Sequence, residues 1–167
     1  MSQKSHKVEQ SGRFSERRVN MLVGSYQHNI DAKGRLIMPA KYREHVGPTF
    51  IVSLGFDNCV RAYSPEEWEK FKAKIDALPD EDEDVLMIKN VIYSNSAECE
   101  VDKQGRILIP QNLRNYANLT SGVMIIGMSN CIDIWDSNNW NDKYGSIDRN
   151  LGAMMKKVSD KGSKDGI

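Results

Sequence analysis

Two thirteen-residue stretches of this 167-residue chain carry residues that could contact nucleic acid. DAKGRLIMPAKYR spans residues 31–43, and DKQGRILIPQNLR spans residues 102–114. Both have Asp, Gly, Arg, Pro and a second Arg at matching positions, 71 residues apart. An arginine at the tip of a hairpin presents a fixed fork of N–H donors, which suits phosphate groups and the edge of guanine.

The same residues could also serve only to build a turn. In Asp-x-x-Gly-Arg the aspartate can cap the turn, the glycine can take a positive φ, and the arginine can pair with the aspartate. A turn does not need the second arginine, yet Arg43 recurs as Arg114. A structural Asp–Arg pair would explain the first arginine of each copy equally well, so both interpretations stay open at this point.

The repeat extends beyond these stretches at an offset of 72. Apolar runs at 50–55 and 123–127 are followed by turns that end in Asn-Cys, by the alternating segments VRAY and IDIW, and by Trp68 or Trp140. Two tandem copies that share one core are therefore predicted. Each copy is expected to contain a strand, a hairpin turn, a strand, a short helix after Pro39 or Pro110, and two further strands.

Five segments follow from this pattern. SPEEW at residues 64–68 predicts a helix start, with Ser64 as N-cap, Pro65 in the first turn and Glu67 closing a capping box. Both chain ends are polar and are expected to be flexible, and Met21 is a possible second start. The predicted organisation is an N-terminal extension (1–20), a first unit (25–67), a helical connector (68–95), a second unit (96–139) and a C-terminal tail (145–167).

The formal net charge is zero, and residues 21–144 carry 13 basic and 18 acidic side chains. If the protein binds DNA, a local cluster must do so while the acidic residues lie elsewhere. No apolar run is long enough for a membrane span, and no secretory signal is expected, because residues 1–20 have no apolar segment. Three cysteines without a CxxC pair favour a reducing, cytoplasmic setting.

An enzyme is not expected, because HExxH, GxSxG and phosphate-binding loop motifs are absent from the sequence. Cys59 and Cys131 occupy equivalent repeat positions and are expected to pack in the core. The acidic run at residues 80–84 is interpreted as a solvated linker rather than a metal site. We predict no cofactor, no metal and no small-molecule substrate. Single-stranded RNA is disfavoured because no aromatic residues flank the basic tips.

The motif Asp-x-x-Gly-Arg-apolar-x-apolar-Pro-x-x-apolar-Arg resembles the signature of swapped-hairpin DNA-binding modules of the AbrB superfamily. Two copies, separated by a helical pair that begins SPEEWEKF, are similar to the MraZ family over about residues 21–144. The resemblance implies a mixed α+β, β-rich fold in which two AbrB-like units form one pseudo-twofold barrel with flanking helices.

The resemblance also implies a function. MraZ-like proteins are expected to be cytoplasmic, nucleoid-associated transcriptional regulators that form ring-shaped homo-oligomers. The ring would contact direct repeats in double-stranded promoter DNA of the division and cell-wall gene cluster that includes its own gene. The predicted DNA-binding residues are Arg35, Arg106, Lys33, Lys103, Arg43 and Arg114, and the predicted loop-positioning residues are Asp31, Asp102, Gly34 and Gly105.

Two features depart from the family pattern or allow another function. The first 20 residues lie outside the pattern, and Gln104 replaces a basic residue, so the contribution of the second unit stays open. The alternative is an antitoxin-like or scaffold protein whose tail binds another protein through Leu151, Met154 and Met155.

Overall fold

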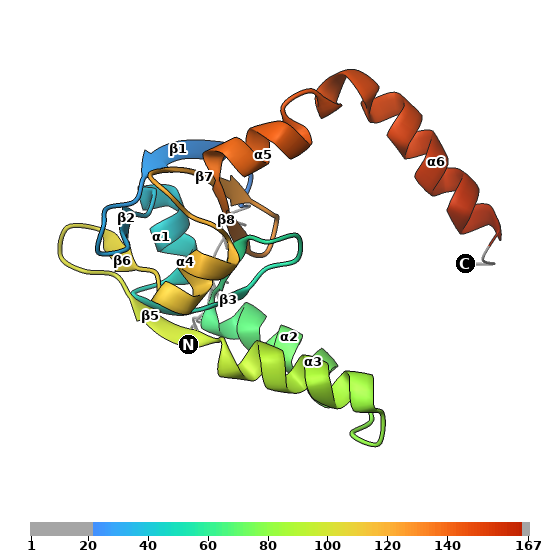
Figure 1. The fold of residues 1–167 in the computed structure, drawn as a ribbon, viewed down its shortest axis with the longest axis horizontal. Helices are drawn as coiled ribbons and strands as arrows, with labels where there is room; N and C mark the ends of the chain where they lie inside the picture. The colour runs from blue at the N-terminus through green and yellow to red at the C-terminus, as the bar shows by residue number, and fades with distance from the viewer. Residues whose placement is uncertain (1–21, 165–167) are drawn as a thin grey trace, which may run out of the picture.

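The computed structural model describes residues 22–164 as strands and helices around one sheet (Figure 1). The predictions for residues 1–20, for a start at Met21 and for the last three residues lie outside the described residues. The strands are β1 (Ser25–Asn29), β2 (Arg35–Ile37), β3 (Thr49–Leu54), β4 (Val60–Tyr63), β5 (Ala97–Glu100), β6 (Arg106–Leu108), β7 (Gly122–Gly127) and β8 (Ile132–Asp136). The helices are α1 (Ala40–Val46), α2 (Pro65–Asp76), α3 (Glu83–Ser94), α4 (Gln111–Tyr116), α5 (Ser137–Tyr144), the 3₁₀ turn η1 (Ile147–Asn150) and α6 (Leu151–Lys164).

The strand order shows that the two repeats interleave. Six antiparallel strands follow the order β1-β7-β8-β4-β3-β5, and β2 pairs with β6 in a separate two-stranded sheet. The first strand of each repeat therefore pairs with the third strand of the other repeat. If each strand is exchanged for its equivalent in the other repeat, the same strand order is obtained, read from the opposite edge of the sheet. This symmetry indicates a pseudo-twofold axis between β4 and β8. Each repeat thus completes its sheet with strands from the other.

The mixed α+β class is confirmed, but two details of the prediction are not. β1 and β5 end the six-stranded sheet, so the described residues do not form a closed barrel. Residues 22–164 are also not β-rich, because each strand has three to six residues whereas α2, α3 and α6 have 12 to 14. These helices lie outside the repeated strands, so the repeat pattern could not predict how long they are.

The core lies between the sheet and the two short helices α1 and α4. Tyr42 and Val46, four residues apart on α1, and Leu113 at α4 are buried. The prediction for the cysteines is also confirmed, since Cys59 and Cys131 are both buried. Burial of such side chains from both repeats in one cluster is the main stabilising contribution expected for a domain of this size.

An ion pair lies at the centre of the six-stranded sheet. Arg61 and Asp133 occupy equivalent repeat positions and face each other across β4 and β8. Arg61 Nε and Nη2 donate to the two carboxylate oxygens of Asp133 at 2.6 and 2.8 Å. The side chains are only 16% and 5% exposed. The hydrogen bond to Asp133 raises the pKa of Arg61 above its ordinary value, so Arg61 keeps its charge in this buried place.

Helices α2 and α3 form a hairpin that projects from the sheet (Figure 1). Ser64 Oγ accepts from the backbone N–H of Glu67 at 3.3 Å, as predicted for the N-cap. The Glu67 side chain does not close the predicted capping box; it accepts from Lys70 and Asn130 instead. Stacking of Phe71 on Tyr63, with ring centroids 5.2 Å apart, joins α2 to the sheet.

The C-terminal segment differs from the predicted tail, because residues 151–164 form helix α6. Leu151, Met154, Met155 and Val158 recur at i, i+3, i+4 and i+7, the spacing of one helical face. Lysine, methionine and alanine are good helix formers, which offsets the two glycines in this segment. In Figure 1 the helix extends away from the sheet, and its apolar residues are exposed.

No helix within residues 22–164 has the length and apolar content needed to cross a membrane.

Candidate nucleic-acid interface

The loop between β1 and β2 is held by the side chain of Asp31. Its Oδ1 accepts from the backbone N–H groups of Lys33 and Arg35 at 3.0 and 2.9 Å. Its Oδ2 accepts from Arg35 Nε at 2.7 Å. The Gly34 N–H closes the turn on the Asp31 carbonyl, and Gly34 has a φ of 86°. The side chain of Asp31 is therefore bonded both to the backbone of the turn and to the arginine that follows it.

The loop between β5 and β6 repeats this bonding. Asp102 accepts from the N–H groups of Gln104 and Arg106 at 2.9 Å each and from Arg106 Nε at 2.8 Å. Gly105 has a φ of 77°. Because the two loops have the same bonds although one has Lys33 and the other Gln104 at the same place, the bonded residues Asp, Gly and Arg alone set their shape.

The ion pairs of the two loops persist at neutral pH. Hydrogen bonds, chiefly from the backbone N–H of Arg35, lower the pKa of Asp31, and those of Arg106 lower the pKa of Asp102. A carboxylate with a lowered pKa stabilises the fold above the ordinary value of 3.8, and this contribution is lost as the pH falls through the lowered value. Within residues 22–164 only Nε of each guanidinium has a bonded partner, which leaves the Nη groups available to a ligand.

Strands β2 and β6 form an antiparallel ribbon that presents both arginines on one face. Arg35 lies opposite Leu108, and Ile37 lies opposite Arg106. Side chains alternate along a strand, so these four point outward while Leu36 between them is buried. Ile37 and Leu108 are 49% and 56% exposed. The outward face is therefore an alternation of two guanidinium groups and two aliphatic side chains.

The exposed aliphatic pair was not among the predicted site residues. Both residues lie in the apolar runs LIM and ILI, at the variable position between the two apolar residues of the repeated motif. The missed signal is the two-residue period of a strand: if Leu36 and Met38 face the core, Ile37 between them must face solvent.

Arg43 and Arg114, also predicted to bind DNA, lie beneath the loops rather than at their tips. A Cβ added to Gly105 would lie 2.5 Å from Arg43 Nη1, and one added to Gly34 would lie 2.6 Å from Arg114 Nε. Each arginine thus packs under the loop of the other repeat. The Nε atoms of both are buried and have no hydrogen-bond partner within residues 22–164. A supporting role explains why both arginines recur, and DNA contact by them stays a prediction.

The lysines of the loops are placed differently from these arginines. Lys33 and Lys103 are exposed next to the two turns, and Lys41 is exposed on α1. In Figure 1 the β2–β6 ribbon and its loops lie on the opposite side of the sheet from the α2–α3 hairpin and α6. The predicted contact residues at the tips are thus brought together on one side of the molecule.

Comparison with known proteins gives a match to one protein family. A family model described as "MraZ protein, putative antitoxin-like" matches the chain twice, over residues 21–91 and 92–153. The chain belongs to the MraZ family. The two matches divide the chain within helix α3, between the two repeats defined by the sheet.

Curated relatives from several bacteria carry the same family name. The "Transcriptional regulator MraZ" of Acetivibrio thermocellus is 48% identical over 83% of this chain and 97% of the relative. The proteins of the same name from Thermoanaerobacter sp. and Caldicellulosiruptor saccharolyticus are 41% and 42% identical, over 84% and 85% of this chain and 98% and 99% of the relatives. These relatives are named as regulators and not as enzymes.

The two loop glycines of this MraZ-family chain provide a test of how the loops are built. Replacing Gly34 or Gly105 with alanine is expected to destabilise the fold by roughly 1–3 kcal/mol through backbone strain at positive φ. Gly34→Ala should be the worse change, because its Cβ would also lie 2.9 Å from the backbone oxygen of Ile109. At Gly105 the nearest atoms belong only to the Arg43 side chain, which can move.

Urea unfolding followed by circular dichroism measures this difference. Gly24→Ala is the matched control, because Gly24 has a φ of 96° and nothing within 4 Å of its added Cβ. It therefore reports backbone strain alone. Equal unfolding midpoints for Gly34→Ala and Gly24→Ala would contradict the close contact between the loop and the opposite repeat.

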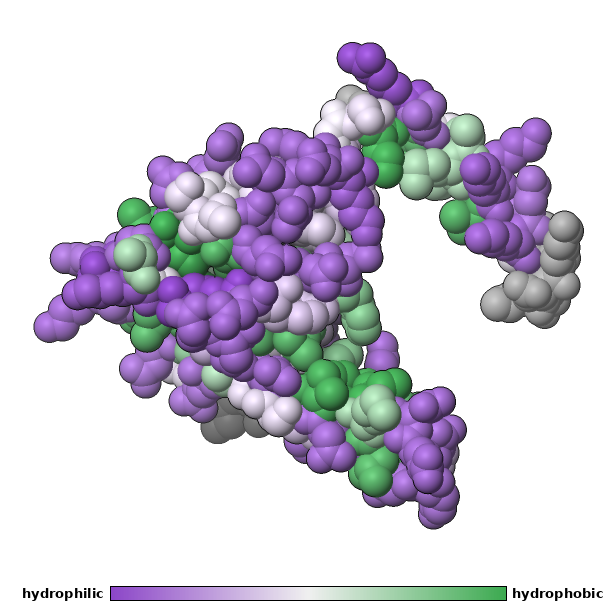
Figure 2. All heavy atoms as spheres, viewed as in Figure 1, coloured by the Kyte–Doolittle hydropathy of each residue, from purple (hydrophilic) through white to green (hydrophobic). Residues whose placement is uncertain are grey.

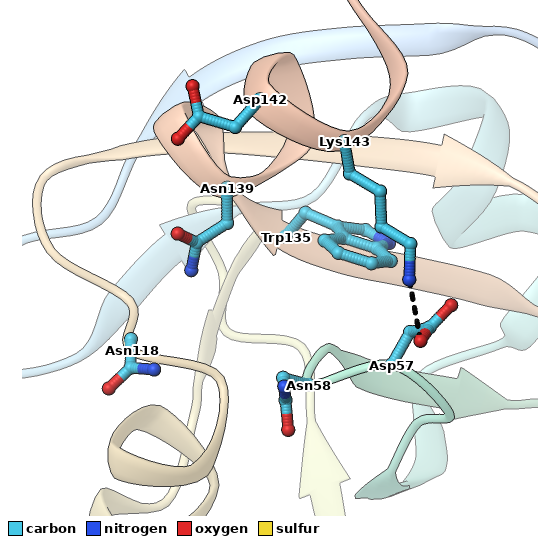
Figure 3. Close-up of a pocket in the computed structure, with 7 residues that line it drawn as sticks. All are labelled: Asp57, Asn58, Asn118, Trp135, Asn139, Asp142 and Lys143. Carbon is cyan, nitrogen blue, oxygen red and sulfur yellow. Dashed lines mark ion pairs between the residues drawn. The ribbon is translucent and has the colours of Figure 1, made fainter. Parts of the chain in front are cut away.

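A separate cavity of about 420 Å³ lies between the β3–β4 turn and α5 (Figure 3). Lys143 reaches across the Trp135 ring and pairs with Asp57 at 2.6 Å. The hydrogen bond from Lys143 lowers the pKa of Asp57. Amides of Asn58, Asn118 and Asn139 complete most of the lining, and no histidine, cysteine or serine of residues 22–164 lines it. The part of the lining that the structure describes therefore contains no Ser–His or Cys–His pair.

The three cysteines are expected to be unreactive in the folded MraZ-family protein. Burial raises the pKa of Cys59 to about 12 and those of Cys99 and Cys131 to about 11, and only the thiolate is a strong nucleophile. Labelling with a chromogenic disulfide reagent at pH 8 should be slow in buffer and should reach three thiols in urea. A thiol that reacts rapidly in the folded protein would contradict the buried packing role.

Proposed function

We propose that this chain is a DNA-binding transcriptional regulator whose β2–β6 ribbon and adjacent loops contact the major groove. The observation that carries the proposal is the outward face of the ribbon, where Arg35 and Arg106 alternate with Ile37 and Leu108. The names of the curated relatives support the regulator part of the proposal.

The ribbon fits a known mode of base recognition. The major groove of B-DNA, about 12 Å wide, admits a two-stranded β-ribbon. Arginine donates to the O6 and N7 acceptors of guanine, and aliphatic side chains pack on the methyl group of thymine. Both arginines are held at Nε by Asp31 or Asp102, so their direction is set before DNA arrives. Such preorganisation lowers the entropy lost on binding.

The charge distribution supports the same face. Nine acidic and four basic residues lie within 65–94, the segment of the α2–α3 hairpin. This hairpin lies away from the ribbon (Figure 1). The net negative charge of residues 21–144 is therefore concentrated away from the face that would approach phosphate, with Lys33 and Lys103 adding positive charge beside it.

Assembly into a homo-oligomer completes the proposal. One ribbon with a few cations would bind weakly, because affinity grows with the number of phosphates that are neutralised. Several ribbons on one ring would bind direct repeats with increased effective concentration. The proposed target is promoter DNA of the division and cell-wall gene cluster that includes the chain's own gene. The protein would then act in the cytoplasm, at the nucleoid.

An antitoxin-like or scaffold function is the second candidate. It is favoured by helix α6, whose exposed apolar side chains are available to another protein. Deleting residues 145–167 separates the two functions: a scaffold would lose a co-purifying protein while the ribbon still binds DNA.

The test is a titration against DNA from upstream of the chain's own gene, with a scrambled duplex of equal length as control. Binding is expected to be tighter on the native duplex and to weaken steeply as salt rises. Equal, weak binding to both duplexes would mean that the Asp-x-x-Gly-Arg loops serve only as turns in this chain.

A further inference from the structure

The first loop (residues 31–34) and the second loop (residues 102–105) are exposed except at their glycines. Gly34 and Gly105 are buried, whereas the other three residues of each loop are exposed. Figure 2 shows mostly hydrophilic side chains over this end of the molecule, at the left of the view. Neither loop contains a large apolar side chain, so burial of its own side chains cannot hold it in place. The contacts of the buried glycines are therefore the ones that fix each loop on the fold.

The glycine of the second loop contacts the first repeat at two points. The Met38 N–H donates to the carbonyl oxygen of Gly105 at 3.0 Å. A Cβ added to Gly105 would lie 2.5, 2.8 and 3.3 Å from Nη1, Cζ and Nε of Arg43. The guanidinium group of Arg43 therefore lies directly against Gly105, an approach that the missing Cβ of glycine allows.

The glycine of the first loop has the reciprocal contacts with the second repeat. The Ile109 N–H donates to the carbonyl oxygen of Gly34 at 2.9 Å. A Cβ added to Gly34 would lie 2.6 and 2.7 Å from Nε and Cζ of Arg114. Gly34 directly precedes Arg35 in the chain. Arg114 of the second repeat thus supports the backbone that carries the outward arginine of the first repeat.

The two supporting guanidinium groups act by packing rather than through their Nε atoms. Within residues 22–164 the Nε atoms of Arg43 and Arg114 are buried and have no hydrogen-bond partner. A buried N–H group without a partner costs free energy, and such a group in a folded protein calls for an explanation. The same cost occurs at equivalent positions of both repeats. Support of the opposite loop explains why both guanidinium groups lie there.

We propose that Arg43 and Arg114 are positioning residues for DNA recognition, each acting on the other repeat. Arg43 sets the direction of Arg106 through Gly105, and Arg114 sets the direction of Arg35 through Gly34. This inference rests on the proposed DNA-binding function of the ribbon and assigns each outward arginine a support in the opposite repeat. Neither repeat then holds its own outward arginine in place alone.

Hydrogen exchange of the full chain without DNA, followed by mass spectrometry, tests the crossed contact. The reporters are the backbone N–H groups that donate to Asp31 and Asp102. Arg43→Met should speed exchange in the second loop by roughly threefold to a hundredfold and leave the first loop unchanged, because one local contact is lost. Arg114→Met should do the reverse. The control, Lys41→Met, removes a charge from α1 outside the contact and should change neither loop.

The crossed pattern separates positioning from a general loss of stability. Faster exchange in both loops after either substitution would overturn the proposal, because it would show that the whole fold is weakened. Unchanged exchange in both loops would overturn it, and so would faster exchange in the loop of the substituted repeat. These outcomes do not depend on DNA, so the contact is judged separately from the proposed function.

Affinity for the native upstream duplex then shows whether the contact serves recognition. Arg43→Met should weaken binding by roughly threefold to a hundredfold in the wild type and in the Arg35→Ala protein. In the Arg106→Ala protein the further loss should be below about twofold, because the residue that Arg43 positions is already absent. An equal loss in both backgrounds would overturn the proposal, since Arg43 would then contact DNA itself.

Arg43→Lys distinguishes the shape of the side chain from its charge. Lysine keeps the charge but lacks the planar group that lies against Gly105, so this variant should bind as weakly as Arg43→Met. Wild-type affinity of Arg43→Lys would overturn the proposal. A wild-type protein that binds no DNA would overturn the positioning role together with the proposed function, and the exchange result would then describe a contact of the fold alone.

Discussion

Replacing Arg35 and Arg106 together with alanine is expected to lower the affinity for native promoter DNA by roughly thirtyfold to ten-thousandfold. Each arginine that reads a guanine is worth about 1–3 kcal/mol, and about 1.4 kcal/mol corresponds to a tenfold change. The preference for the native over the scrambled duplex should fall as well, because these two side chains would read bases. Fluorescence anisotropy at two salt concentrations measures both effects.

Lys72→Ala/Lys74→Ala is the matched control. It removes the same two positive charges from α2, on the other side of the molecule from the ribbon (Figure 1). Its affinity should stay close to that of the wild type. Both proteins should unfold at nearly the same urea concentration, since exposed ion pairs contribute little to stability. Equal affinity of the arginine variant and the control would end the ribbon hypothesis.

Replacing Asp133 with alanine is expected to destabilise the fold by about 3–5 kcal/mol, because it leaves Arg61 charged and without its partner inside the protein. Arg61 is only 16% exposed and has both carboxylate oxygens of Asp133 as acceptors. Changing both residues, as Arg61→Met/Asp133→Leu, should be far less harmful and is expected to lie near the wild type. Urea unfolding of Arg61→Met, of Asp133→Leu and of the double variant completes the cycle, with Asp133→Ala measured beside them.

Lys72→Ala supplies the comparison with an exposed pair. Lys72 and Asp76 are 44% and 47% exposed and lie on one face of α2. The loss expected there is below about 1 kcal/mol. A double variant as unstable as Asp133→Ala would show that packing around Arg61, and not its unpaired charge, carries the effect.

Much of the fold could be predicted because local chemistry repeats in the chain. Asp31 and Gly34, with their counterparts, specify the two hairpin turns, and Ser64 specifies the start of α2. These signals are local, since each depends on hydrogen bonds within a few residues. The predicted positions of Arg35 and Arg106 at the loops followed from the same turns.

The pairing between repeats could not be predicted in this way. Both copies have the same alternation of apolar residues, so the pattern fits strands paired within a repeat as well as strands exchanged between repeats. Only the exchange brings Arg43 beneath Gly105, and this contact joins residues that are distant in sequence. Helix α6 was missed for a different reason: its apolar stripe covers no surface of its own chain, so composition alone indicated a polar tail.

The position of Arg61 and Asp133 has a consequence for how this gene can change. Residues next to a twofold axis meet their own counterparts, so one repeat acting as a symmetric dimer would place two arginines or two aspartates against each other in a buried sheet. Like charges in such a place repel strongly. Because these two positions carry opposite charges, each repeat pairs favourably with the other repeat and unfavourably with a second copy of itself. The duplicated gene can no longer be shortened to a single self-pairing copy without a change at residue 61 or 133.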